Sequence, residues 1–178
     1  AAVSKAGYEA HPRLEQKAVV SSETRATDAA QKEVESKKRQ LIGSLICAVP
    51  LFYIAMGGML GWPVPPQLSG MQNMMNLALT ELLLCIPILF INRHYFIGGF
   101  RSLIHGAPNM DALIALGSSA SFAYSVVNLY QMANAFVVGD LTAVHAAMHG
   151  MYFESAGLIL TLITLGKFFE ARAKGRTT

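Results

Sequence analysis

The sequence predicts an all-α integral membrane protein with four transmembrane helices, and its composition and charge pattern both lead to this class. Of its 178 residues, 53% are hydrophobic and only 14% are charged, which is unusual for a soluble domain. Residues 41–80 and residues 112–139 contain no Asp, Glu, Lys or Arg. Each of these two runs is longer than the ~20 residues that a helix needs to cross a bilayer.

The chain divides into a polar N-terminal part and a transmembrane part, residues 41–178. Residues 13–40 are charged and show no sustained apolar period, so we expect a cytoplasmic linker there. The first span is predicted over residues 41–60. The following segment, "GWPVPPQLSG", contains three prolines and is expected to form a turn, because it cannot sustain a helix.

The second span is predicted over residues 74–97 and contains Glu81 and Pro87. After it, "IGGF" places Gly98 next to Gly99, and the apolar residues of the next turn fall on one side. This pattern predicts that the second helix is kinked at the double glycine and continues as an amphipathic helix on the membrane surface. An ordinary loop with a short amphipathic turn is the alternative.

The third and fourth spans are predicted over residues 110–132 and 151–169. The third begins at "APNMD", where Pro108 and Asn109 suit a helix start. None of the 14 Lys and Arg residues lies in residues 61–73 or 131–150. By the positive-inside rule these two connections face outward, which predicts a multi-pass cell-membrane protein with both termini in the cytoplasm. The distribution, despite a net charge of +3, does not suggest nucleic acid as a partner.

Two acids flank the fourth apolar run. Glu154 and Glu170 are 16 residues apart, which on a helix is about 24 Å, close to a hydrocarbon thickness. They should therefore mark opposite faces of the membrane. Ionised groups are costly in hydrocarbon, so such acids are candidates for an ion path. The alternative is that both side chains only reach out to water or cap the helix.

Met110 gives the inner acid a possible partner. Antiparallel packing of the third and fourth spans would bring Met110 and Glu170 to the same membrane level. A thioether beside a carboxylate makes a weak mixed site that suits a soft cation such as Cu(I), although a methionine in packing or facing lipid is the simpler interpretation. The outer segments also gather several Met and His residues, so metal release there is an open alternative to ordinary interfacial residues. Cys47 and Cys85 are expected to be packing residues.

Two long motifs carry a family resemblance. "PNMDALIALGSSASFAYS" and "YFESAGLILTLITLGKFFEARAKGRT" closely resemble the paired membrane segments of heavy-metal-transporting P-type ATPases, most of all the copper exporters. "IGGF" looks like the double-glycine kink of that family. "SKAGYEA", in residues 1–12, is similar to the last strand of the family's metal-binding domain, and these residues are interpreted as a remnant of that domain.

The resemblance implies a pump that exports copper(I) at the expense of ATP, with Mg²⁺, through an aspartyl-phosphate intermediate. It implies that Met110 and Glu170 are the cytoplasmic ligands for metal uptake and that Glu154 lies on the release path. It also implies that Gly98 and Gly99 create a platform, with Arg101 on it. A copper chaperone, or the pump's own metal-binding domain, would dock there.

The departures from the family pattern limit what this chain could do alone. It contains no DKTGT, TGE or CPC sequence, so no catalytic residue is assigned and no nucleotide site is expected. We expect the first four spans of a longer pump, whose partners are the remaining spans, the cytoplasmic domains and the lipid bilayer. The alternatives are the same portion of a zinc or cadmium pump, and a non-catalytic four-helix module for metal binding or assembly.

Overall fold

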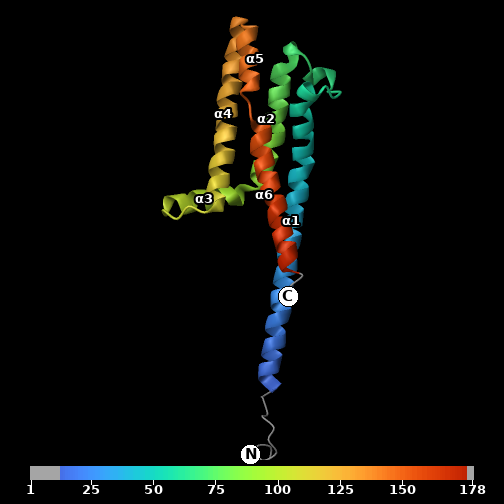
Figure 1. The fold of residues 1–178 in the computed structure, drawn as a ribbon, viewed down its shortest axis with the longest axis vertical. Coiled ribbons are helices and arrows are strands. Elements are labelled where there is room, and N and C mark those ends of the chain that lie inside the picture. The colour runs from blue at the N-terminus through green and yellow to red at the C-terminus, as the bar shows by residue number, and fades with distance from the viewer. Residues whose placement is uncertain (1–12, 176–178) are drawn as a thin grey trace, which may run out of the picture.

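The computed structural model describes the backbone of residues 13–175 and the side chains of residues 28–175. The predicted metal-binding-domain remnant, residues 1–12, lies outside this part of the chain. The described residues form helices and no strands: α1 (Arg13–Leu60), η2 (Pro66–Leu68), η3 (Met71–Asn73), α2 (Met74–Ile91), α3 (Arg93–Ile104), α4 (Met110–Val138), α5 (Leu141–His149) and α6 (Phe153–Lys174). The long helices lie along one direction, α3 crosses one end of the bundle, and α5 lies beside α4 at the other end (Figure 1).

Four described segments are long and apolar enough to cross a membrane: Asp28–Leu60, Met71–Ile91, Met110–Val138 and Leu141–Lys174. The predicted all-α architecture with four spans is therefore confirmed. The residues expected to form a linker, 13–40, continue the first span as one helix, and the N-terminal part of this helix projects beyond the end of α6 (Figure 1). The later part of the range lies beside other helices, since Lys37 is placed over the Tyr95 ring of α3.

The bend after the second span lies at Asn92, not at the double glycine. Helix α2 ends at Ile91, and α3 then runs through both Gly98 and Gly99 without interruption. The second span is thus shorter than the predicted 74–97. Helix α3 has the predicted character of a surface helix, since it lies across the bundle and exposes large apolar side chains (Figure 1). These are Ile97, Phe100 and Ile104.

A buried polar network holds the bend. The Asn92 side chain is fully buried, and its Nδ2 donates to the Ile88 carbonyl at 2.9 Å and to Ser44 Oγ of α1 at 2.8 Å. Thr164 Oγ1 of α6 donates to Asn92 Oδ1 at 2.7 Å. A buried amide is costly unless its donors and acceptors are paired. Because these partners come from α1, α2 and α6, the bend can form only where those three helices meet.

Gly99 sets the distance between α3 and α4. A Cβ at Gly99 would overlap the backbone oxygen of Asp111 and would lie 2.7 Å from the Ala115 Cβ. A Cβ at Gly98 would meet only the Asp111 carboxylate, at an ordinary 3.5 Å. Small residues of this kind let two helix backbones approach closely. The glycine pair therefore serves helix packing, through Gly99, rather than a kink.

The outer connection predicted between residues 131 and 150 contains a helix that the sequence analysis missed. Helix α4 continues to Val138 and ends at Gly139, whose φ of 79° is left-handed. Asp140 then caps α5, because its side chain accepts a hydrogen bond from the Ala143 N–H at 3.0 Å. A glycine after one helix followed by an aspartate before the next is a stop and start signal. That signal is present in the sequence.

Hydrogen bonds from α4 fix the link between α5 and α6. Asn128 Nδ2 donates to the Gly150 carbonyl at 3.0 Å, and Ser125 Oγ accepts from the Tyr152 N–H at 2.6 Å. The apolar core lies between the helices and includes Leu51, Cys85, Ile88, Met132, Phe153 and Leu160. Both cysteines are free thiols, Cys85 buried and Cys47 partly buried, which agrees with the packing role predicted for them.

Replacement of Gly99 by Ala should destabilise the fold by about 1–3 kcal/mol, because the added methyl forces backbone apart at a tight contact. Gly98→Ala is the matched control and should change the unfolding free energy little. Thermal or denaturant unfolding of the two variants in detergent, followed by circular dichroism, measures the difference. Equal stability of the two variants would contradict the role given to Gly99.

Replacement of Asn92 by Ala should lower the unfolding free energy by about 1–2 kcal/mol, since it removes a shared partner of Ser44 and Thr164. Asn134→Ala changes an exposed asparagine on α4 and is the control, with little expected loss. The same unfolding measurements apply. A stable Asn92→Ala protein whose α2–α3 angle is unchanged in spin-label distance measurements would show that the network does not hold the bend.

Candidate metal path

Helix α6 carries the two predicted acids at its two ends. Glu154 is the second residue of the helix, and Glu170 lies in its last two turns. The helix between them is unbroken and packs against α1, α2 and α4. The two carboxylates therefore lie at opposite ends of one span, as the spacing predicts.

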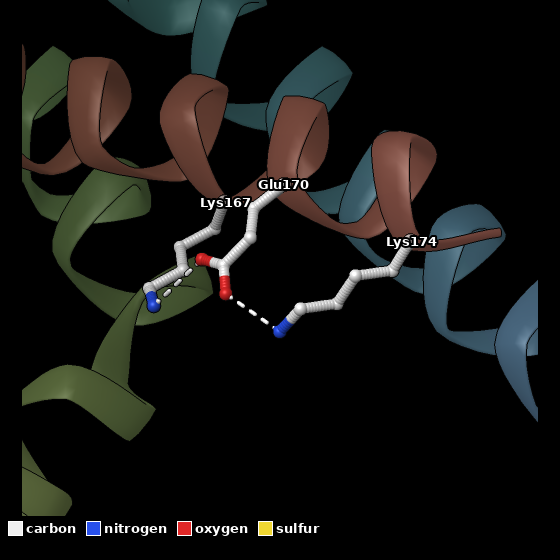
Figure 2. Close-up of polar contacts among 3 residues, drawn as sticks. All are labelled: Lys167, Glu170 and Lys174. Atoms are coloured by element: carbon white, nitrogen blue, oxygen red, sulfur yellow. Dashed lines mark hydrogen bonds and ion pairs between the residues drawn. The ribbon is translucent and has the colours of Figure 1, made fainter. Parts of the chain in front are cut away.

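Glu170 is engaged by two lysines of its own helix. Lys167 Nζ lies 3.1 Å from Glu170 Oε2, and Lys174 Nζ lies 2.8 Å from Glu170 Oε1 (Figure 2). Both carboxylate oxygens thus face an ammonium group, and all three side chains are partly or largely exposed. Exposed pairs of this kind contribute little stability and rearrange easily. A metal cation at Glu170 would have to compete with these two lysines.

Met110 is the first residue of α4 and its side chain is 51% exposed. The start of α4 is tied to α3, because Asn109 Oδ1 accepts hydrogen bonds from the Ala112 N–H and from Ser102 Oγ, both at 3.0 Å. Helix α4 begins at the level of α3, whereas α6 continues past that level beside α1 (Figure 1). The polar contacts of Glu170 are with its lysines, so its pairing with Met110 stays a prediction.

Glu81 has a neighbour that the sequence could not reveal. The side chain of this α2 residue is only 2% exposed, and the nearby charge that it experiences is that of Glu154. Cys85, one turn further along α2, experiences both carboxylates. The packing of α2 against α6 therefore brings two acids and a thiol to one helix interface. Acidic residues within membrane spans are rare, and those that face the protein interior often line an ion path.

These groups do not by themselves complete a metal site. Within the described part of the chain, no three or more His, Cys, Asp and Glu side chains are grouped so that they could hold a metal ion. Any site of higher coordination would need methionines, waters or residues from other spans. The Glu81–Glu154 neighbourhood is therefore best described as a polar stretch at the α2–α6 interface.

The predicted platform residues lie on α3. Gly98, Arg101, Ser102 and His105 line a shallow hollow of about 250 Å³ on this helix. Arg101 is exposed, and its carbonyl lies 2.7 Å from His105 Nδ1. A basic group over a shallow surface is suited to an acidic partner, and it would act mainly on the association rate.

His94, on the buried side of α3, titrates away from its ordinary range. Partial burial lowers the pKa of His94 from 6.5, Lys37 of α1 lowers it further, and Asp111 of α4 opposes them. Among the described residues, its Nε2 is buried without a hydrogen-bond partner. The folded state therefore favours the neutral form of this imidazole more than the unfolded chain does.

Stability should fall as the pH falls, and His94 should account for part of the slope. The folded-state pKa of His94 is below 6.5, so in this range the unfolded chain binds more protons than the folded protein. The stability that the neutral imidazole contributes is therefore full above pH 6.5 and is lost as the pH falls through the folded-state pKa. Thermal midpoints in detergent from about pH 8 to about pH 5 test this. His94→Gln should flatten the profile, and Asn134→Ala, a change at an exposed residue that does not titrate, should leave it unchanged. A His94→Gln profile with the original slope would contradict the assignment.

The spans, the surface helix and the acids between α2 and α6 together define a multi-pass helical membrane protein with ionisable groups along a helix interface. Sequence comparison then identifies the kind of membrane protein. The chain is 33% identical over 99% of its length to the copper-exporting P-type ATPase of Staphylococcus saprophyticus subsp. saprophyticus. It is 34% identical over 97% of its length to the copper-exporting P-type ATPase of Staphylococcus haemolyticus. It is also 34% identical over 83% of its length to a probable copper-importing P-type ATPase A of Enterococcus hirae.

The chain is thus related, over nearly all of its length, to a segment of copper-transporting P-type ATPases, which confirms the resemblance carried by its two motifs. It spans about a fifth of the length of the curated relatives that it matches, 19% of the first two and 18% of the third. No protein-family model matches the chain, and no solved structure is significantly similar to it.

Proposed function

We propose that this chain forms the part of an ATP-driven copper pump through which copper(I) enters from the side of α3 and leaves from the side of α5. The observation that carries the proposal is the match of the chain to copper-transporting relatives along 99% of its length. The acids at both ends of α6 support it. Copper(I) is the substrate, and ATP and Mg²⁺ would be bound by parts of the parent protein outside this segment.

In this proposal Met110 and Glu170 take up copper at the cytoplasmic side, and both termini lie in the cytoplasm of a cell-membrane protein. The thioether supplies a soft ligand and the carboxylate supplies charge. The two lysines at Glu170 would weaken copper binding at this site, since the ion must displace an ammonium group from the carboxylate. Copper would be held weakly there and passed inward.

Gly98, Gly99 and Arg101 would present α3 to a copper chaperone or to the pump's own metal-binding domain. Gly99 supports this role by seating α3 closely on α4. Arg101 and the hollow beside it offer a basic surface. The remaining spans and the cytoplasmic domains of the pump would supply the ligands and the energy that this segment lacks. At the other end, Glu154, with Glu81 of α2 near it, would offer carboxyl oxygens as ligands on the way to release.

The uptake role is tested in the full-length pump. Met110→Ala and Glu170→Ala should each raise the copper concentration for half-maximal ATP hydrolysis on the order of tenfold. Loss of a residue that only supports a ligand lowers metal affinity by about that factor, and loss of the ligand itself should lower the affinity at least as much. Lys167→Ala with Lys174→Ala should lower that concentration, since it frees the carboxylate. Unchanged titrations in all these variants would overturn the uptake site.

The release role is tested separately. Glu154→Gln should leave the copper dependence of phosphorylation unchanged and slow metal loss from the phosphorylated pump, because a neutral amide attracts the cation less. Glu35→Gln changes an exposed acid on α1 and is the control. Equal metal retention by the original protein and the Glu154→Gln variant after phosphorylation would remove Glu154 from the path.

The direction of transport is part of the same test, because relatives named as exporting and as importing match at similar identity. Inside-out membrane vesicles that contain the pump should accumulate copper when ATP is added, which is the expected result for an exporter. Accumulation only in right-side-out vesicles would reverse the proposed direction. A response to zinc or cadmium in place of copper would favour the alternative pump class.

A further inference from the structure

We propose that His145 and His149 of α5 form a two-imidazole metal site at the end of the bundle away from α3, one that takes a divalent transition-metal ion, with Cu²⁺ the tightest. The two residues are four apart on one helix, so their side chains lie on the same face. Their ring centres are 4.4 Å apart and the ring planes meet at 64°.

The ring spacing matches two adjacent coordination positions of one metal. With a metal–nitrogen bond of about 2.0 Å and the ring centre about 1.2 Å further out, imidazoles at right angles place their centres roughly 4.5 Å apart. Imidazoles on opposite sides of the metal would place them roughly 6.4 Å apart by the same geometry. The observed 4.4 Å fits the first arrangement. Tetragonal Cu²⁺ accepts adjacent nitrogen ligands in this way.

Both rings are free to bind. His145 and His149 are exposed, and in the part of the chain that the structure describes neither ring takes part in a hydrogen bond. By contrast, His105 on α3 contacts the Arg101 carbonyl through Nδ1. Imidazole is a ligand that suits Cu, Zn and Ni, and Cu²⁺ binds most tightly among the divalent first-row ions. Waters would complete the coordination.

The helix that carries the pair is held rigidly. Val144 is fully buried and Ala147 nearly so, which fixes the opposite face of α5 against the bundle. Asp140 caps the first turn, and Asn128 of α4 binds the carbonyl of Gly150 directly after the last. Because the helix is already held in place, metal binding would lose little backbone conformational entropy. Residues 131–150 contain no Lys or Arg, so no cation on this segment repels the metal.

The site does not depend on the proposed transport path. It lies on α5, whereas the acids of the path lie on α2 and α6. The histidines are on the surface and Glu81 is buried between helices. Binding at the pair can therefore be present or absent whether or not the chain transports copper.

The test uses Cu²⁺–nitrilotriacetate with the full-length chain in detergent, read by electron paramagnetic resonance. The chelator leaves two adjacent positions on the metal, so the probe selects neighbouring imidazole pairs and discriminates against single histidines. The unmodified protein should show a saturable signal with two imidazole nitrogens. His145→Ala and His149→Ala should each lose it, and His105→Ala should keep it.

A spacing variant separates chelation from the number of histidines. The double change His149→Ala with Ala146→His keeps two exposed imidazoles on α5 but sets them about 100° apart around the helix. This variant should also lose the two-nitrogen signal. Retention of that signal in His145→Ala, or equal binding by the spacing variant, would overturn the site. All substituted positions are exposed, so unchanged thermal midpoints should accompany each result.

Discussion

The bend at Asn92 depends on one constraint, which is that hydrocarbon offers no hydrogen-bond partner to a chain that changes direction. The bend therefore has to form where the protein itself supplies partners. The Asn92 side chain donates to the Ile88 carbonyl at the end of α2, and Ser44 of α1 and Thr164 of α6 pair the rest of that side-chain amide. The position of α3 follows from this network, and with it the surface on which the proposed platform residues lie. Gly99 then sets how closely that helix rests on α4.

The same constraint explains which parts of the fold the sequence could predict. Four spans follow from uncharged length, and length is a local property. The bend is not local, because Asn92 becomes a suitable turning point only through residues 48 positions before it and 72 positions after it. A glycine pair is a strong local signal for flexibility, and for that reason the kink was predicted at Gly98 and Gly99. Their actual role, through Gly99, depends on the backbone of Asp111 in another helix. Helix α5 is a different case, since Gly139 and Asp140 were a local signal within a segment assumed to be a loop.

The acids show the same division between local and distant information. That Glu154 and Glu170 lie at opposite ends of one helix could be predicted from spacing alone. The lysine pairs of Glu170 were also readable, because Lys167 and Lys174 lie three and four residues away, on the same helix face. The neighbour of Glu81 was not readable, because it depends on the packing of α2 against α6. The partners of an acidic residue inside a span can be assigned only when the helix that packs against it is known.

A path for a cation cannot follow α6 alone. Sixteen residues at ~100° each leave Glu154 and Glu170 roughly 160° apart around that helix, so the two carboxylates face different neighbours. Glu170 pairs with lysines at the exposed end, whereas Glu154 accepts a hydrogen bond from Ser155 Oγ and is near enough to Glu81 of α2 to act on its charge. Between them the buried face of α6 carries Thr161 and Thr164, and Thr164 is already engaged by Asn92. An ion that moves from one acid to the other must therefore leave α6 and use ligands from other helices. Since the two Glu170 oxygens are held by ammonium groups and Glu81 is buried beside a second acid, the electrostatic environment differs at the two ends. An approaching cation meets competition from ammonium groups at the first acid and a second carboxyl group near the other.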